Sequence, residues 1–147
     1  MCTLPPPARA KSSIRTLVAR PDVSSGRRFP LCILLPGGAG RMPEATGVLD
    51  SLGQDLARRG WIVVGPVSPD GTSFFAEAAD QVVSVMDQME RDPEVRAGKT
   101  LLVGVSNGGI AAFQLAGMIP DRVSGVIALP GILNHWTKVK GLEHLPV

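Results

Sequence analysis

The sequence predicts one α/β domain built around a mainly parallel β-sheet. Four short apolar runs alternate with stretches of helical periodicity, which is the pattern of repeated β-α-β units. The runs are residues 31–35, 61–64, 100–105 and 123–129. Crossovers of this length place neighbouring strands parallel, so the carboxyl ends of the strands are expected at one edge of the sheet, where ligands bind.

Three helices are expected between and after these strands. The apolar stripe of the first consists of Val48, Leu49, Leu52 and Leu56. The stripe of the second consists of Phe75, Ala79, Val82, Met86 and Met89. Gly60 suits the end of the first helix, and Thr72 or Ser73 suits the N-cap of the second. The third helix is expected over residues 107–119, because Pro120 stops it.

Composition predicts a soluble globular chain. The 147 residues are 44% hydrophobic and 19% charged, with a net charge of +2 and few aromatic residues, which argues against nucleic-acid and membrane-surface partners. No apolar run reaches the roughly 18 residues of a membrane span. With two cysteines, Cys2 and Cys32, a disulfide framework is not expected, and a reducing compartment such as the cytoplasm is.

Residues 1–29 are expected to form an N-terminal extension to a core of residues 30–147. The extension is basic, contains serines and is poor in acids, which is typical of an organelle transit peptide. Residues 14–19 nevertheless alternate in a way that favours an edge strand, followed by a turn at Pro21. Import into an organelle therefore stays as the alternative to a cytoplasmic location.

The stretch LLVGVSNGG, residues 101–109, ends an apolar strand on a serine flanked by glycines. Gly-x-Ser-x-Gly is the pattern of a nucleophile elbow, in which residues without Cβ let the chain turn sharply and leave the Ser106 Oγ free. Its position after a strand and before a helix is the one the pattern requires. The alternative is that Ser106 only caps a helix beside a tight turn.

A second glycine cluster, LLPGGAG at residues 34–40, ends the first strand and is expected to face Ser106. Preorganised N–H donors stabilise the oxyanion of acyl transfer, each by about 3 kcal/mol, and the expected donors are the N–H groups of Gly38 and Asn107. A dinucleotide loop is the alternative. It fails because Pro43 takes the third glycine position and no acid ends the next strand. No cofactor or metal is expected.

These residues resemble the α/β hydrolases, and among them lidless esterases such as polyhydroxybutyrate depolymerase-like, feruloyl esterase-like and dienelactone hydrolase-like proteins. RFPLCILLPGGAG is similar to their strand and oxyanion loop, and LARRGWIVVGPVSPDG to the next helix and strand. GKTLLVGVSNGGIAAFQLAGMIPDRVSGVIALPG is similar to their elbow, its helix and the next strand. The resemblance implies a serine hydrolase of esters or thioesters with Ser106 as nucleophile. Pro36 stands where many members have histidine.

The resemblance also implies an acid and then a histidine after later strands. The sequence ends at GLEHLPV, which resembles the approach to the next strand, so the expected fold is an α/β-hydrolase fold truncated at its C-terminal strands. His135 is the substitute base within the chain, with Asp70 or Glu143 as acid. His144 is expected on the opposite face.

Two functions remain open at this point. One is a serine hydrolase whose acid and base lie outside this sequence or on another chain, acting on a small ester or thioester. The other is a non-catalytic hydrolase-fold module that binds a ligand through the same cleft. Two roles are open for Phe74, Asn134 and Trp136: they line an acyl pocket, or they pack in the core or at its rim. Without later strands, residues 123–129 form an unpaired edge, through which self-association is expected.

Overall fold

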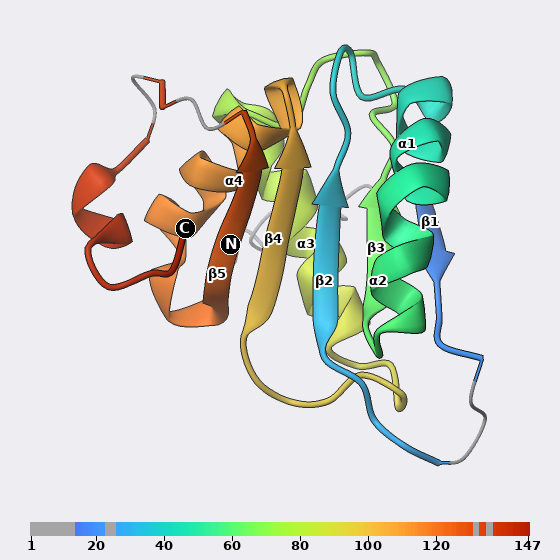
Figure 1. The fold of residues 1–147 in the computed structure, drawn as a ribbon. Helices are drawn as coiled ribbons and strands as arrows, with labels where there is room; N and C mark the ends of the chain where they lie inside the picture. Colours follow the sequence, from blue (N-terminus) through green and yellow to red (C-terminus); the bar gives the residue numbers. More distant parts are fainter. Residues whose placement is uncertain (1–13, 23–25, 131–132, 135–136) are drawn as a thin grey trace, which may run out of the picture.

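The computed structural model describes residues 14–22, 26–130, 133–134 and 137–147. A five-stranded sheet lies between two layers of helix, with α1 and α2 on one face and α3 and α4 on the other (Figure 1). The elements are β1 (Thr16–Ala19), β2 (Leu31–Leu35), α1 (Met42–Val48), η1 (Leu49–Gly53), α2 (Gln54–Arg58), β3 (Ile62–Pro66), η2 (Ala76–Ala78), α3 (Ala79–Met89), β4 (Thr100–Val105), α4 (Asn107–Met118), η3 (Pro120–Arg122), β5 (Val123–Leu129) and η4 (Val139–Leu142).

The strand order is β1-β3-β2-β4-β5, and every pair is parallel except β1 with β3. Strands β2, β4 and β5 have the predicted bounds, because each is a mainly apolar run that ends at a glycine or proline turn. Strand β3 begins one residue later than predicted, at Ile62. The strand expected within residues 14–19 is β1. The carboxyl ends of the four parallel strands therefore meet at one edge, the upper one in Figure 1.

Helices α1 and α2 form one helical segment joined by η1, a π-helical turn that the periodicity did not predict. Val48 and Leu49 are buried as expected and pack on the α1–α2 face of the sheet with Leu34 and Val63. The segment ends before Gly60, which has a φ of +95° and donates its N–H to the Ala57 carbonyl. The expected stripe thus covers one face of the sheet despite the wider turn.

The second helix begins later than predicted. Thr72 and Ser73 do not cap it, since α3 starts at Ala79. The Thr72 hydroxyl and N–H instead donate to Asp70, and the Ser73 Oγ donates to the Gly38 carbonyl. Within α3 the predicted stripe is buried against the sheet. The third helix, α4, is also as predicted and packs on β4 and β5.

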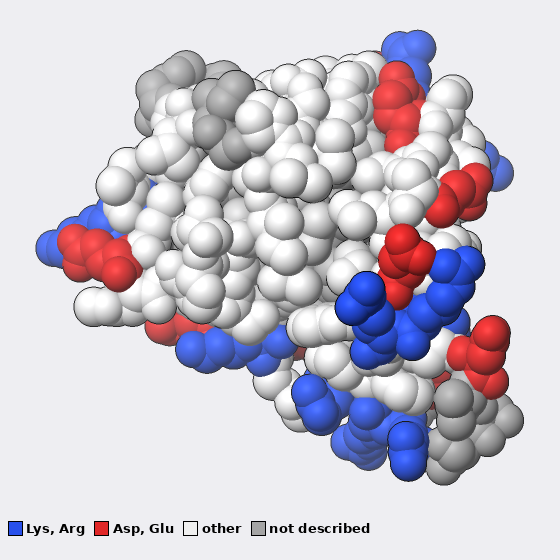
Figure 2. Space-filling model, viewed as in Figure 1, with Lys and Arg blue, Asp and Glu red and all other residues white. Residues whose placement is uncertain are grey.

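One part of the sheet has no helix over it. Strand β5 lies at the end of the strand order, and no helix lies in front of it on the α1–α2 face (Figure 1), whereas Leu34 of β2 and Val103 of β4 are buried there in one cluster with Val48 and Leu49. Ile127 is 45% exposed there and Leu129 53%. Figure 2 shows no charged side chain over the middle of this face. Along the free edge, the Val126 N–H donates to the Pro146 carbonyl at 2.8 Å.

Candidate active site

Ser106 lies at the carboxyl edge of the sheet, directly after β4 and at the start of α4. Its φ of 54° and ψ of −116° are rare for a residue with a side chain, and such strain concentrates at functional sites. Its N–H donates to the Leu129 carbonyl at 2.7 Å, which ties the turn to the end of β5. The side chain is exposed. The structure therefore presents the Ser106 hydroxyl in a sharp strand-to-helix turn, as the sequence predicted.

The glycines around Ser106 allow backbone to approach backbone. A Cβ on Gly104 would lie 2.1 Å from the Gly108 carbonyl oxygen, and a Cβ on Gly108 would lie 2.1 Å from the Leu35 carbonyl oxygen. Neither position has room for a side chain. The first contact lets α4 start directly above β4, and the second brings the start of α4 against the end of β2, where the other glycine cluster begins.

That cluster lies beside the serine. A Cβ on Gly37 would lie 3.5 Å from the Ser106 Cβ, so the loop passes Ser106 with room for no more than a small side chain between them. Gly38 has a φ of +56°, and its carbonyl accepts hydrogen bonds from the Asn107 Nδ2 at 3.0 Å and the Ser73 Oγ at 2.6 Å. These bonds fix the loop to the start of α4 and to the segment after β3.

The N–H groups of Gly38 and Asn107 make no hydrogen bond with other residues in the described part of the chain. Asn107 is the first residue of α4, where N–H groups have no partner within the helix. The structure thus places two free backbone donors on the two segments that meet at Ser106.

A groove of about 580 Å³ runs from this point along the front of the sheet. Its polar side chains are Glu44 and Ser51, and most of the rest of its wall is apolar or glycine. The lining residues are Gly37, Gly38, Glu44, Gly47, Val48, Ser51, Leu52, Val105 and Leu129. Its lining therefore includes Gly38, Val105, which precedes Ser106, and Leu129, whose carbonyl accepts the Ser106 N–H.

Asp70, one of the two predicted acids, makes local hydrogen bonds. Its Oδ1 accepts from the Thr72 hydroxyl, the Thr72 N–H and the Ser68 hydroxyl. The hydrogen bond from the Thr72 side chain holds the pKa of this exposed carboxyl below its ordinary value. In this part of the structure Asp70 stabilises the turn after β3, and no histidine of the described residues bonds to it.

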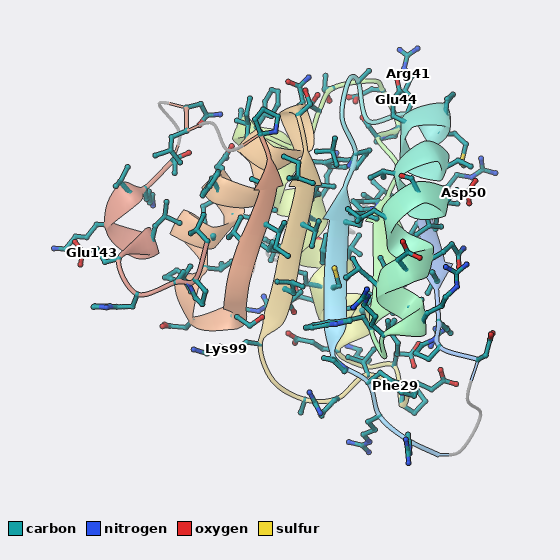
Figure 3. The ribbon with its side chains drawn as sticks, viewed as in Figure 1. Phe29, Arg41, Glu44, Asp50, Lys99 and Glu143 are labelled. Carbon is teal, nitrogen blue, oxygen red and sulfur yellow. The ribbon has the colours of Figure 1, made fainter. Side chains whose placement is uncertain are left out.

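Neither Glu143, the other predicted acid, nor His144, which was expected on the opposite face, makes a hydrogen bond to Ser106. Glu143 is exposed after η4, on the far side of β5 from α1 (Figure 3). His144 is exposed beside it. His135 lies outside the described residues. Among the residues that are described, none accepts or donates a hydrogen bond at the Ser106 Oγ.

Of the residues suggested for an acyl pocket, Phe74 is a core residue. It is 1% exposed, and one edge of its ring lies against Gly40. Asn134 accepts a hydrogen bond from the Thr137 hydroxyl at 3.2 Å, and Trp136 lies outside the described residues. Glu44 and Ser73 are the site residues that sequence reasoning missed. No sequence pattern around Glu44 predicts this position, because Glu44 lies beside Gly38 only as a result of the tight turn that follows β2.

A second groove, of about 940 Å³, lies on the α3–α4 side. Gln114 holds its wall: its Oε1 accepts from the Ala76 N–H at 2.8 Å and its Nε2 donates to the Ala76 carbonyl at 3.0 Å. Ala76 has a φ of +55°, so these two bonds fix a strained residue.

The described residues contain no group of three or more histidine, cysteine, aspartate or glutamate side chains that could hold a metal ion. They also contain no helix of the length and apolarity that crossing a membrane takes.

Solved structures resemble this chain over most of its length. A thermostable esterase superposes with a TM-score of 0.69 at 16% identity, covering 89% of this chain and 40% of its own. The ferulic acid complex of Est1E from Butyrivibrio proteoclasticus gives 0.61 at 18% identity, over 77% of this chain and 47% of its own. A phospholipase/carboxylesterase from Dyadobacter fermentans gives 0.60 at 18%, over 82% and 61%.

Among curated proteins, dipeptidyl-peptidase 5 of Porphyromonas gingivalis is 24% identical over 131 residues, which is 80% of this chain and 19% of that protein. No family model matches the chain. The chain therefore spans about a fifth of its curated relative and less than two thirds of each of these structures. The likeness shows the fold: the mainly parallel sheet between helices is the α/β-hydrolase fold, as the sequence predicted.

Proposed function

We propose that this chain carries the nucleophile half of a serine hydrolase that cleaves carboxylic ester or thioester bonds. Ser106 is the nucleophile, and the N–H groups of Gly38 and Asn107 form the oxyanion hole. The observation that carries the proposal is the exposed hydroxyl in a strained elbow, beside a loop with a free N–H. The esterases and hydrolases among the structural neighbours support it.

In this mechanism the Ser106 Oγ attacks the substrate carbonyl carbon, and the carbonyl oxygen becomes an oxyanion between the two N–H groups. Collapse of this intermediate expels the alcohol or thiol and leaves an acyl-enzyme, which water then hydrolyses. The hydroxyl proton must pass to a base and then to the leaving group. We place that base outside the described residues: His135, a further segment of the protein, or a second chain.

A fluorophosphonate probe tests the nucleophile. Reaction with the intact native protein forms a bond between phosphorus and the Ser106 Oγ and releases fluoride, so mass spectrometry should find one adduct on the peptide with Ser106. Ser106→Ala should abolish the adduct. Ser124→Ala is the matched control, because Ser124 is also an exposed serine but lies on β5; it should label like the wild type.

The same experiment decides the alternative, a non-catalytic module that binds a ligand through this cleft. If the folded wild type does not label within hours at a large excess of probe, Ser106 is not an active nucleophile. Equal labelling of Ser106→Ala would also exclude Ser106 as the nucleophile.

The expected partner of either function is a small molecule, and we keep the cytoplasm as the expected compartment.

We also propose that the protein self-associates through β5. This strand lies at the sheet edge, and two of its own residues, Ile127 and Leu129, expose apolar side chains. An edge of this kind pairs with other strands. Sedimentation velocity at micromolar concentration should show species larger than a monomer, and Ile127→Lys should shift them toward the monomer. A wild type that sediments as a clean monomer would contradict the proposal.

A further inference from the structure

Among the described residues that line the groove beginning at the oxyanion loop, Glu44 alone is charged. It lies in the first turn of α1, and its side chain folds back over Gly38: a Cβ on Gly38 would lie 3.2 Å from the Glu44 Oε1 and 3.3 Å from its Cγ. Figure 3 shows Glu44 at the end of the sheet toward which β2 and β4 point. The carboxylate is therefore next to one of the two proposed oxyanion donors.

One oxygen of this carboxylate has no partner. The Glu44 Oε2 is buried and makes no hydrogen bond with any residue in the described ranges. A buried carboxylate oxygen loses its hydration, and leaving it unpaired is unfavourable. The start of α1 provides some compensation through the helix dipole, but no side chain or N–H reaches the oxygen. Because Oε2 is enclosed by protein atoms, a ligand in the groove meets only the rest of this carboxylate, as a negative charge in an otherwise largely apolar lining.

The charge also acts on the proposed reaction. A negative carboxylate beside Gly38 opposes the negative charge that develops on the substrate oxygen at that position. A positive group on the substrate would neutralise the charge of the Glu44 carboxylate beside the oxyanion. The neutralisation matters most in the transition state, so it would raise the turnover rate as well as the affinity.

We propose that Glu44 is a specificity residue that selects substrates with an ammonium group on the acyl chain close to the reacting carbonyl. This rests on the proposed function of Ser106 and names its substrate class. The apolar walls formed by Val48, Leu52 and Val105 accept the carbon chain, and the Glu44 carboxylate, which lines the same groove, accepts a hydrogen bond from the ammonium through its accessible part. Charge-assisted hydrogen bonds of this kind are about twice as strong as neutral ones.

Matched 4-nitrophenyl esters test the proposal. 3-Aminopropanoyl and butanoyl groups have the same length and differ in an ammonium against a methyl group. The wild type should prefer the ammonium ester by about tenfold in kcat/KM, the effect of one charge-assisted hydrogen bond. Glu44→Gln keeps the shape and removes the charge. It should slow the ammonium ester by about tenfold and speed the butanoyl ester, because the repulsion on the oxyanion is lost.

Asp50→Asn is the control. Asp50 is an exposed carboxylate on the same helical segment, it does not line the groove, and Figure 3 shows it on the outer side. This variant should leave the preference between the two esters unchanged. Equal rates for the two esters in the wild type, or an unchanged ratio in Glu44→Gln of normal thermal stability, would overturn the proposal. Glu44→Leu should show the same loss of preference, and its failure to do so would also count against it.

A binding measurement separates this proposal from that of the nucleophile. In Ser106→Ala, which cannot form an acyl-enzyme, the dissociation constants of the ethyl esters of the same two acids report the groove alone. The ammonium ester should bind about tenfold tighter, and Glu44→Gln in this background should remove the difference. If fluorophosphonate fails to label Ser106 but this preference is found, the hydrolase proposal fails and the Glu44 site stands. If labelling occurs and the two esters bind equally, the Glu44 site fails and the nucleophile stands.

Discussion

Replacing Gly104 with alanine tests the central packing contact of the elbow. The new Cβ would lie 2.1 Å from the Gly108 carbonyl oxygen, 2.3 Å from its carbon and 2.6 Å from the Gly109 nitrogen. Real Cβ atoms do not approach other atoms closer than 3.0 Å, and all three atoms belong to backbone, so no side chain can turn away. Helix α4 must move away from β4 by roughly 1 Å. Overpacking of this kind destabilises a domain by about 3 kcal/mol at the upper end of its range.

The assay is urea unfolding followed by far-UV circular dichroism, with a thermal melt beside it. A loss of about 3 kcal/mol corresponds to a decrease in Tm of roughly 6–12 °C for a domain of this size. Gly47→Ala is the control, because a Cβ there meets nothing within 4 Å and the residue lies inside α1. That variant should gain about 0.5–1 kcal/mol from the higher helix propensity of alanine. If Gly104→Ala unfolds at the wild-type urea concentration, the close approach of α4 to β4 is wrong.

Three further outcomes are expected. Gln114→Leu should lower the free energy of unfolding by about 2 kcal/mol in urea titrations, since it leaves the N–H and the carbonyl of Ala76 without their partners; no change would contradict both bonds. Burial raises the pKa of the Cys32 thiol to about 12, so iodoacetamide should modify the peptide with Cys32 only after unfolding, and modification of the native protein would contradict the burial. The Arg20 guanidinium, 2.7 Å from Asp92, holds the pKa of that carboxyl below 3.8, so the pair stabilises the fold above that pH and stops doing so as the carboxylate is protonated below it. Arg20→Ala, which also removes the ion pair with Glu94, should therefore lose about 0.5 kcal/mol near neutral pH and progressively less as the pH falls below 3.8, and a loss that does not change with pH would contradict the assignment.

The strands could be predicted because each is a short, mainly apolar run with a turn at its end. For β2, β4 and β5 the residues and the bounds agree. The π-helical turn η1 could not be predicted in the same way. An apolar stripe at the spacing of Val48, Leu49 and Leu52 fits an α-helix equally well, and one wider turn leaves the same face toward the sheet.

The elbow was predictable from its glycines, because backbone segments can approach each other as closely as at Gly104 and Gly108 only where neither residue has a side chain. The surroundings of Ser106 were not. Ser73 fits a helix cap by local rules, yet its hydroxyl donates to the Gly38 carbonyl, 35 residues earlier in the chain. This contact exists because β2 and β3 are neighbours in the sheet, and no local pattern of residues encodes which loops that arrangement brings together.

The sheet ends at the antiparallel strand β1 on one flank and at β5 on the other. Successive peptide groups of a strand point to opposite sides, so in the regular part of β5 the amide of Ala128 faces outward in the same direction as that of Val126, which donates to the Pro146 carbonyl. Deuterium should therefore enter at Ala128 quickly and at Val126 slowly. Slower uptake at Ala128 would register the arrival of any new neighbour along β5, whatever its identity.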